Sequence, residues 1–435
     1  MTDIKHLHGK KSSVQGLSLL QLPARANNFP FLLLCMKNVA LMKIETGKGK
    51  ITLAALIGIW SVSALTSLPG LAVSPILDKL KTIFPTASEF DIQMLTSLPS
   101  LLIIPFVLLA GHLTARVPYY RLLAWGLWLF LLSGVLYFFC GEMWQLIAVS
   151  ALLGVGAGII IPLSTSLVSR FFVGDYRVRQ FGYVSAIANV TLVLATALAG
   201  YLADVQWRLP FMVYLLPIVS IVLIPFMSAC DATAGGGGTE QKNASAGSVG
   251  FPRLLPYMLY YFLVTYLTVV VSFNLPFLMG ELKYDSDVSG VVISLFFLAI
   301  MAPGFVLSPI LRVMKAGVEW ICLLLIAVGL LLIFSFSSLW IIALGCIVSG
   351  VGYGIVQPYL YDCAAKVSSA GRVAFALALL MAMNYVAILV CPFIVDYLQR
   401  IMHVESQSFA FGLNAVVAFA VLLAMLAVYI CKRKR

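Results

Sequence analysis

One nine-residue stretch occurs twice in the chain, as GVGAGIIIP at residues 154–162 and as GVGYGIVQP at residues 350–358. Six of the nine positions are identical, at a constant offset of 196 residues. Small residues in apolar segments let helices pack closely, so glycine-rich helices also converge by chance. Because the copies hold corresponding places in two halves of the chain, duplication is the better interpretation. It predicts helix contacts at Gly154, Gly158, Gly350 and Gly354.

The composition around this repeat is that of a membrane protein. Hydrophobic residues make up 62% of the chain and charged residues 10%, with a mean hydropathy of +1.03. A soluble domain carries about 25% charged residues, so this chain lacks the polar side chains to cover a water-exposed surface. Twelve stretches are long enough to cross about 30 Å of hydrocarbon as helices. We place them at 51–76, 92–112, 121–139, 144–168, 179–203, 208–228, 253–279, 286–310, 318–337, 340–363, 372–396 and 406–430.

The longest break between these spans divides them into two sets of six. It covers residues 229–252 and contains four consecutive glycines at 235–238, a composition that stays flexible. The stretches on either side, 51–228 and 253–430, are equal in length. We therefore expect two six-helix bundles joined by a cytoplasmic linker and followed by a basic cytoplasmic tail at 431–435.

The first 50 residues do not fit this plan, and two interpretations are open. Residues 1–50 are either a cytoplasmic extension that lies on the membrane surface, or translation begins at Met42 and leaves a short basic leader. Sequencing the N-terminus of the purified protein distinguishes them, because a peptide from residues 5–40 excludes the late start.

The basic residues indicate the orientation and argue against other partners. Most of the 28 Lys and Arg fall on one side of the membrane if both termini are cytoplasmic. We therefore expect an integral protein of the bacterial cytoplasmic (inner) membrane and no nucleic-acid partner. The eight cysteines and four histidines lack the spacing of metal ligands, so we expect no metal and no cofactor.

Two six-helix halves in direct repeat resemble the major facilitator superfamily of secondary transporters. The family carries a signature in the loop between its second and third helices. Gly111, Leu113 and Arg116 match it, whereas Ala115 and Pro118 replace its acidic residue and a glycine. The resemblance covers roughly residues 51–430 and implies an all-α fold of twelve transmembrane helices. It also implies two bundles that rock around a site at mid-membrane.

Within the family, the chain is loosely similar to the drug and small-solute efflux branch. The pair Ser74-Pro75, with Leu98-Pro99 in the next span, is like that group. Ser150 stands where proton-coupled members commonly have an arginine, which weakens the link to proton coupling.

Polar side chains at membrane depth are the candidates for substrate contact, because an unsatisfied polar group in lipid costs several kcal/mol. In the resembled fold, helices 1, 4, 7 and 10 line the cavity, with 5, 8 and 11 contributing. The alternative for each residue is a hydrogen bond between helices. Two of the candidates, Asn189 and Asn384, lie near the repeat offset and are expected to face one another. The candidate set is Ser63, Thr66, Asn189, Asn274, Gln357, Tyr361 and Asn384.

The positions of the charged residues bear on the solute and on coupling. Every charged residue lies in a loop or within a turn or two of a span's end, and a charged solute needs an opposite charge at mid-membrane. We therefore expect a neutral, zwitterionic or amphipathic solute. Asp362 is the best candidate for binding a coupling proton, and its alternative is a solvated charge at the cytoplasmic rim. Tyr257, Tyr260 and Tyr261 are interpreted as an interfacial aromatic belt rather than as stacking partners of a solute.

Five residues are candidates for gating. Pro69 and Pro276 lie in the outer parts of the first and seventh spans, where proline permits bending. Gly111, Arg116 and Arg312 lie at equivalent inner loops. The two arginines are expected to hold the cytoplasmic side shut by binding helix C-terminal carbonyls or nearby acids.

The sequence thus predicts a transporter that moves a small organic solute by alternating access, with proton-coupled export as the main hypothesis. Uptake of a neutral nutrient or a small anion, such as a sugar or a cyanate-like compound, is the alternative. A receptor or a membrane enzyme is a remote alternative. An enzyme needs a nucleophile with a base, or a metal cluster, and neither is found at membrane depth.

Overall fold

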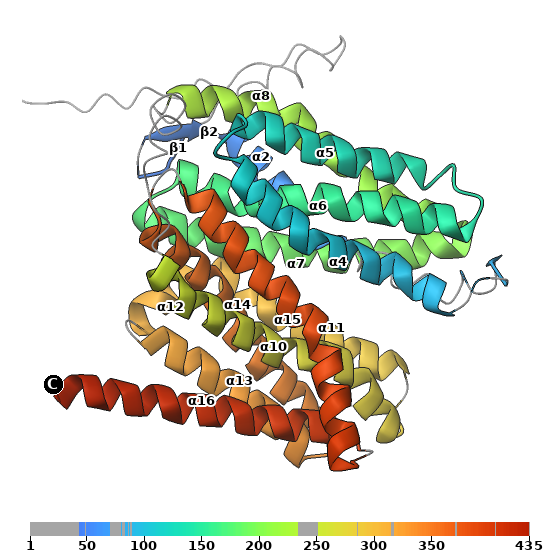
Figure 1. Ribbon diagram of the computed structural model, residues 1–435, viewed down its shortest axis with the longest axis vertical. Helices are drawn as coiled ribbons and strands as arrows, with labels where there is room; N and C mark the ends of the chain where they lie inside the picture. Colours follow the sequence, from blue (N-terminus) through green and yellow to red (C-terminus); the bar gives the residue numbers. More distant parts are fainter. Residues whose placement is uncertain are drawn as a thin grey trace, which may run out of the picture. The chain divides into compact units, whose positions relative to one another are not determined.

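Long helices dominate the chain, and Figure 1 shows their arrangement. The structure, a computed structural model, describes residues 43–47, 49–69, 80, 83–85, 87, 89–233, 251–284, 286–314, 317–369, 372–404 and 406–434. These residues belong to one unit, Met42–Arg435. The N-terminal residues 1–42, the Ser74-Pro75 pair, most of the predicted linker and Arg435 of the basic tail lie outside the described residues.

The elements follow one another in two series. The first contains strands β1 (Lys43–Glu45) and β2 (Lys50–Thr52), helices α2 (Leu53–Ala64), α4 (Glu89–Leu113), α5 (Tyr119–Leu136), α6 (Met143–Phe171) and α7 (Gly174–Val205), the 3₁₀ helix η2 (Leu209–Leu215) and helix α8 (Pro217–Thr233). The second contains α10 (Phe251–Glu281), α11 (Ser286–Phe305), α12 (Leu307–Met314), α13 (Val318–Ser335), α14 (Leu339–Val367), α15 (Val373–Met402) and α16 (Ser408–Lys434).

The helices agree with the predicted membrane spans. Ten segments of the described chain are long and apolar enough to cross a membrane, and two shorter apolar helices cover Leu53–Ala64 and Ser97–Leu113. Large apolar side chains also remain exposed on outward faces, as at Trp128 (58% exposed) and Trp340 (82%). Exposure of this kind suits contact with lipid. The predicted all-α membrane fold is confirmed.

Three spans differ in detail from the prediction: the first, the sixth and the eighth. The sixth is divided at Leu216 into η2 and α8. Helix α2 ends at Ala64, and turns lead on to Pro69, so this proline lies beyond the helix rather than inside it. Pro276, by contrast, lies inside α10. The predicted eighth span is divided at Val306 into α11 and the short α12. The gating roles of both prolines remain predictions.

The glycine repeat is also a repeat of packing. In α6, a Cβ added at Gly154 would lie 2.7 Å from the Pro99 backbone, because α4 crosses there. In α14, a Cβ added at Gly350 would lie 2.8 Å from the carbonyl oxygen of Phe296 in α11. Gly158 and Gly354, one turn later in each copy, meet the same two neighbouring helices. Each helix pair thus packs backbone against backbone.

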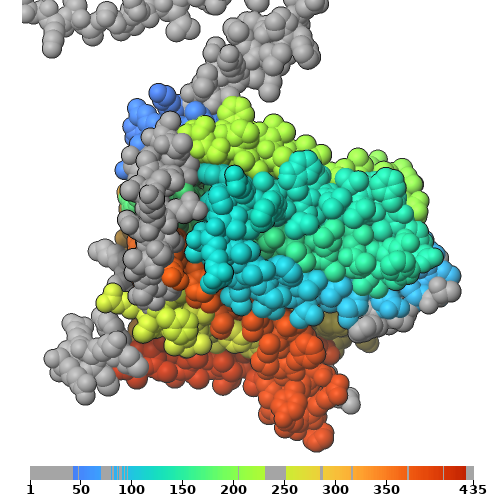
Figure 2. All heavy atoms as spheres, turned by 45° about the horizontal axis from the view of Figure 1, so that its top comes forward, coloured from blue at the N-terminus to red at the C-terminus, as the bar shows by residue number. Residues whose placement is uncertain are grey.

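Two groups of helices meet near one end of the unit. Helices α2 to α8 pack among themselves, as do α10 to α16. The groups touch most extensively where α4 meets α15 and α7 meets α11, and also where α6 meets α15 and α7 meets α12 and α14. Figure 2 shows α4 and α15 side by side on one face. We call these the first and second group. The linker side is the end at which α8 ends and α10 begins, and where α4, α6 and α14 also end.

Candidate functional site

The groups approach most closely at two helix crossings on the linker side. At one crossing, a Cβ added at Gly111 in α4 would lie 2.5 Å from the Cβ of Ala378 in α15. At the other, a Cβ added at Gly304 in α11 would lie 2.5 Å from the carbonyl oxygen of Gly182 in α7. If α11 and α12 are counted as one span, α4 and α11 are each second in their group, and α7 and α15 are each fifth. The repeat therefore produces the same close crossing twice, with Gly111 in one of them.

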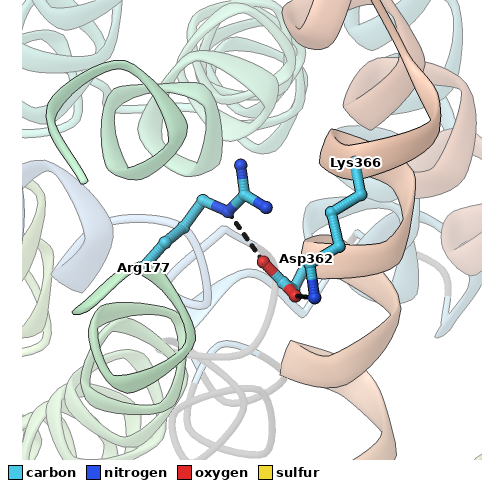
Figure 3. A network of polar contacts seen from close by, with 3 residues as sticks. All are labelled: Arg177, Asp362 and Lys366. Carbon is cyan, nitrogen blue, oxygen red and sulfur yellow. Dashed lines mark hydrogen bonds and ion pairs between the residues drawn. The ribbon is translucent and has the colours of Figure 1, made fainter. Parts of the chain in front are cut away.

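An ion-pair cluster centred on Asp362 joins the groups beside these crossings (Figure 3). The Nε of Arg177, in the first turn of α7, donates to Oδ1 of Asp362 at 2.7 Å. The Nζ of Lys366, one turn further along α14, lies 2.5 Å from Oδ2. The Asp362 side chain is only 3% exposed. The interpretation of Asp362 as a solvated charge at the rim is therefore wrong, because α7 packs over it.

The cost of breaking this cluster follows from its burial. The Arg177 side chain is 13% exposed, so removing Asp362 would leave a nearly buried cation without a counter-charge. Breaking a buried pair from one side costs about 3–5 kcal/mol. Lys366, itself a cation and 60% exposed, cannot supply the missing negative charge. Arg177 and Asp362 therefore form the strongest electrostatic contact between the two groups among the described residues.

A second ion pair joins the groups at the surface. Arg312 in α12 pairs with Asp175 in the first turn of α7, and their side chains are 70% and 68% exposed. Surface pairs of this kind contribute about 0–1 kcal/mol. Arg312 thus has the acidic partner that the gating prediction requires. Arg116 is exposed, and no ion pair of its guanidinium occurs within the described part of the chain.

Gln357 lies at the centre of a chain of hydrogen bonds that also crosses between the groups. Its Oε1 accepts from the hydroxyl of Ser185 in α7 at 3.0 Å, and its Nε2 donates to the hydroxyl of Tyr261 in α10 at 3.2 Å. The Tyr261 hydroxyl also bonds with that of Tyr361 at 2.9 Å. Tyr261 is 0% exposed, so its assignment to an interfacial belt is wrong. Ser185, Tyr261 and Tyr361 are buried and Gln357 is half-buried, and all four side chains are polar and uncharged.

Asn384 forms a second uncharged cluster within the second group. Its Oδ1 accepts from the Thr265 hydroxyl and from the Tyr353 hydroxyl, both at 3.1 Å. The cluster joins α10, α14 and α15. Because Thr265 and Tyr261 lie one turn apart on α10, the two clusters are neighbours along one helix face.

The other predicted polar residues bond to their own helices. Asn189 donates to the Ser185 carbonyl at 2.8 Å and Asn274 to the Val270 carbonyl at 3.1 Å. The hydroxyls of Ser63 and Thr66 likewise bond to carbonyls three or four residues earlier. Within the described ranges, no hydrogen bond joins Asn189 to Asn384. Their proposed contact across the repeat axis, and substrate contact by all four residues, remain predictions.

Several partners in these clusters were not foreseen from the sequence. Arg177, Ser185, Thr265 and Tyr353 come from helices whose mutual placement no local pattern encodes. The sequence distinguishes Tyr353 in one respect: it is a large polar residue in the second glycine repeat, at the position where the first repeat has Ala157.

Comparison with known proteins places these features in a family. Over 162 residues, the chain is 29% identical to the quinolone resistance protein NorA of Staphylococcus aureus. That match covers 36% of this chain and 41% of NorA, so it spans about two fifths of the relative's length.

Solved structures share the fold at low sequence identity. The human organic anion transporter MFSD10 (TETRAN) superposes with a TM-score of 0.65 and 16% identity, over 85% of this chain and 97% of that one. The proton:xylose symporter XylE superposes with a TM-score of 0.66 and 13% identity, over 86% and 95% of the two chains. A profile of the Major Facilitator Superfamily matches residues 52–392 and 257–435. The chain is an integral membrane protein that belongs to this superfamily of transporters, as its sequence predicted.

Proposed function

We propose that the protein exports a small, uncharged or amphipathic organic solute by alternating access between its two helix groups. The chain of hydrogen bonds from Ser185 through Gln357 to Tyr261 is the observation that carries this proposal. Its uncharged donors and acceptors, half-buried at Gln357 and buried at Ser185 and Tyr261, lie beside tyrosine rings where the groups meet. A charged solute needs an opposite charge at this depth. Here the buried charges of Arg177 and Asp362 are occupied with each other.

Similarity to NorA supports export over uptake. The name of that relative refers to quinolone resistance, and 162 residues of this chain align with it. The solved neighbours include a symporter and an organic anion transporter, so the shared fold does not fix a direction. Uptake of a sugar or a small anion is therefore the outcome that the transport assay must distinguish from export.

The linker side is proposed to face the cytoplasm of a bacterial inner membrane, with both termini inside. Cytoplasmic loops of membrane proteins carry an excess of Lys and Arg. In the described chain, far more cations lie at the linker side than at the opposite end, where Arg208, Lys283 and Arg400 lie. The linker-side cations include Arg116, Arg121, Arg170, Arg177, Arg179, Arg253, Arg312, Lys366 and Arg372. In this orientation the structure is closed toward the cytoplasm.

The two ion pairs that join the groups, Arg177–Asp362 and Arg312–Asp175, are proposed to form the cytoplasmic gate. Asp362 is proposed to bind the coupling proton as well. For export driven by an inward proton gradient, a proton that arrives from the opposite side while the linker side is closed would neutralise the Asp362 carboxylate and release its pair with Arg177, which opens the gate. The pair can form again only with the ionised carboxylate, so the proton must leave to the cytoplasm before the gate closes. This dependence would link a proton gradient to the conformational cycle.

Transport in proteoliposomes tests the proposed site. A panel of neutral, zwitterionic and cationic compounds is measured with and without a proton gradient. Replacement of Gln357 with alanine removes the residue that links Ser185 to Tyr261. Because a hydrogen bond contributes about 0.5–1.5 kcal/mol, we expect the KM for the solute to rise about tenfold. Ser294→Ala is the control, since its hydroxyl bonds only to the Gly290 carbonyl within α11.

Three results would contradict this proposal in different ways. An unchanged KM in Gln357→Ala would remove the hydrogen-bonded chain from the solute site. Accumulation of a sugar or anion inside vesicles in which the linker side faces the lumen would favour uptake. Transport that ignores the gradient would remove proton coupling.

A further inference from the structure

The β1–β2 hairpin packs against the start of α7, the helix turn that carries both inter-group ion pairs. The strands pair antiparallel, with Ile44 opposite Ile51 and Glu45 opposite Lys50. The hairpin begins at Lys43, so it is present whether translation starts at Met1 or at Met42. The sequence alone suggested either an extension on the membrane surface or a short basic leader here. Instead, Thr46 and Ile51 are each only 2% exposed.

Three contacts attach the tip of the hairpin to the corner between α6 and α7. The carbonyl of Thr46 accepts from the backbone N–H of Val173 at 3.1 Å. The hydroxyl of Tyr176 donates to the Glu45 carboxylate at 3.3 Å. Gly47 has a φ of +82°, and a Cβ there would lie 2.9 Å from Cγ2 of Val173. Only glycine meets both demands at this position, the left-handed backbone and the close approach.

The corner itself is weakly supported without the hairpin. Helix α7 follows α6 after two residues, and Gly174 has a φ of +57°. The N-cap residue Val173 makes no side-chain capping hydrogen bond. Since the first turn of a helix has backbone donors without intrahelical partners, a start of this kind is easily displaced. The bond from Thr46 to Val173 fixes the residue directly before that turn.

The same turn holds the gate together. Asp175 pairs with Arg312, Arg177 pairs with Asp362, and Tyr176 between them contacts the hairpin. The hairpin also follows directly into α2, and Thr52 both caps α2 and lies 3.4 Å from the Cys230 sulfur in α8. It is therefore fixed to the first group, on which it can brace the first turn of α7.

We propose that the hairpin is a positioning element for the gate: by seating Gly47 and Glu45 on Val173 and Tyr176, it orients Asp175 and Arg177 toward the second group. The linker-side-closed state then depends on a segment of the first group that itself carries neither of the two ion pairs. This proposal rests on the proposed gating role of the ion pairs.

Distance measurements between spin labels test the proposal without knowledge of the solute. The eight native cysteines are replaced, and Ala115→Cys in the first group and Val313→Cys (82% exposed) in the second carry the labels. Gly47→Ala unseats the hairpin tip. We expect it to raise the ratio of open to closed linker-side populations about tenfold, the order set by forcing alanine into a left-handed conformation. Tyr176→Phe, which removes only the hydrogen bond to Glu45, should raise the same population ratio by a smaller factor.

Gly49→Ala is the matched control, because it lies in the same turn with open space around it. Its populations should equal those of the parent protein. Thermal unfolding of each variant shows that the fold is retained, and Tyr176→Phe keeps the test available if Gly47→Ala does not fold. If Gly47→Ala and Tyr176→Phe leave the populations unchanged while Arg177→Gln opens the linker side, the hairpin has no positioning role. If Arg177→Gln also changes nothing, the proposed gate is wrong and the hairpin proposal falls with it.

Discussion

Asp362→Asn is expected to open the linker side and to reduce transport about a hundredfold. The asparagine keeps the size of the side chain but leaves the nearly buried guanidinium of Arg177 without a counter-charge. Breaking a buried pair from one side costs about 3 kcal/mol or more, and each 1.4 kcal/mol is about a factor of ten in a population ratio. Opening the groups lets Arg177 reach water, so the penalty falls on the closed state. Spin-label distances between positions 115 and 313 measure the populations.

The control for this variant is Asp396→Asn. Asp396 pairs with Arg400 four residues further along α15, as Asp362 does with Lys366 along α14. The side chains of Asp396 and Arg400, however, are 61% and 78% exposed. An exposed pair contributes about 0–1 kcal/mol, so we expect wild-type populations. The double variant Asp362→Asn with Arg177→Gln removes the orphaned charge and should recover part of the closed population. Equal populations in Asp362→Asn and the parent protein would show that the pair does not hold the gate.

Gly182→Ala is expected to prevent full closure at the crossing of α7 and α11. The added methyl would collide with the backbone carbonyl of Gly304, which no side-chain rotation relieves. Overpacking of a tight contact costs about 1–3 kcal/mol. Separation of the two groups relieves the collision, so this free-energy cost falls on the closed state alone. We therefore expect the ratio of open to closed linker-side populations to rise roughly tenfold to hundredfold. Gly304→Ala should act in the same way from the other side of the crossing.

Gly290→Ala is the matched control, because Gly290 lies in α11 with open space where its Cβ would stand. In a helix interior, replacing glycine with alanine stabilises the folded protein by about 0.5–1 kcal/mol. It should leave the ratio of open to closed linker-side populations unchanged. The thermal stability of Gly182→Ala should stay near that of the parent protein. Unfolding at a much lower temperature would show instead that the crossing belongs to the folding core rather than to the gate.

The sequence predicted the fold because hydropathy and repetition act locally and add up along the chain. Each span is apolar enough to be recognised by itself, and the duplicated glycines mark backbone contacts that any helix neighbour would require. The end of α2 was harder to predict. The apolar stretch continues to residue 76, yet α2 ends at Ala64. Pro69 does not account for this end, because Pro276 lies inside α10.

The candidate site was predicted in part. Gln357, Tyr361 and Asn384 were selected as polar residues at membrane depth, and the structure places them in two bonded clusters. Their partners Ser185 and Thr265 were missed, because a serine or threonine in a helix usually bonds to its own backbone. Only the tertiary crossing of α7 over α14 brings Ser185 to Gln357.

The partners in the gate could not be predicted from the sequence for the same reason. Asp362 stood out in the sequence as an acid near a helix end, but its burial depends on Arg177, which comes from the other group. The hairpin left a fainter trace, since glycines at positions 47 and 49 separate two short β-branched strands. Their charged neighbours made the segment look like a topology signal instead.

If the protein works by alternating access, the two groups must separate on the linker side in every transport cycle. A cleavable thiol cross-linker between Asp175→Cys and Arg312→Cys, in a protein without native cysteines, tests this separation, because these exposed residues pair across the groups. A link between Asp396→Cys and Arg400→Cys, within α15, is the control. We expect the link between the groups to stop transport, cleavage to restore it, and the control link to do neither. Undiminished transport by the fully cross-linked protein would contradict this expectation.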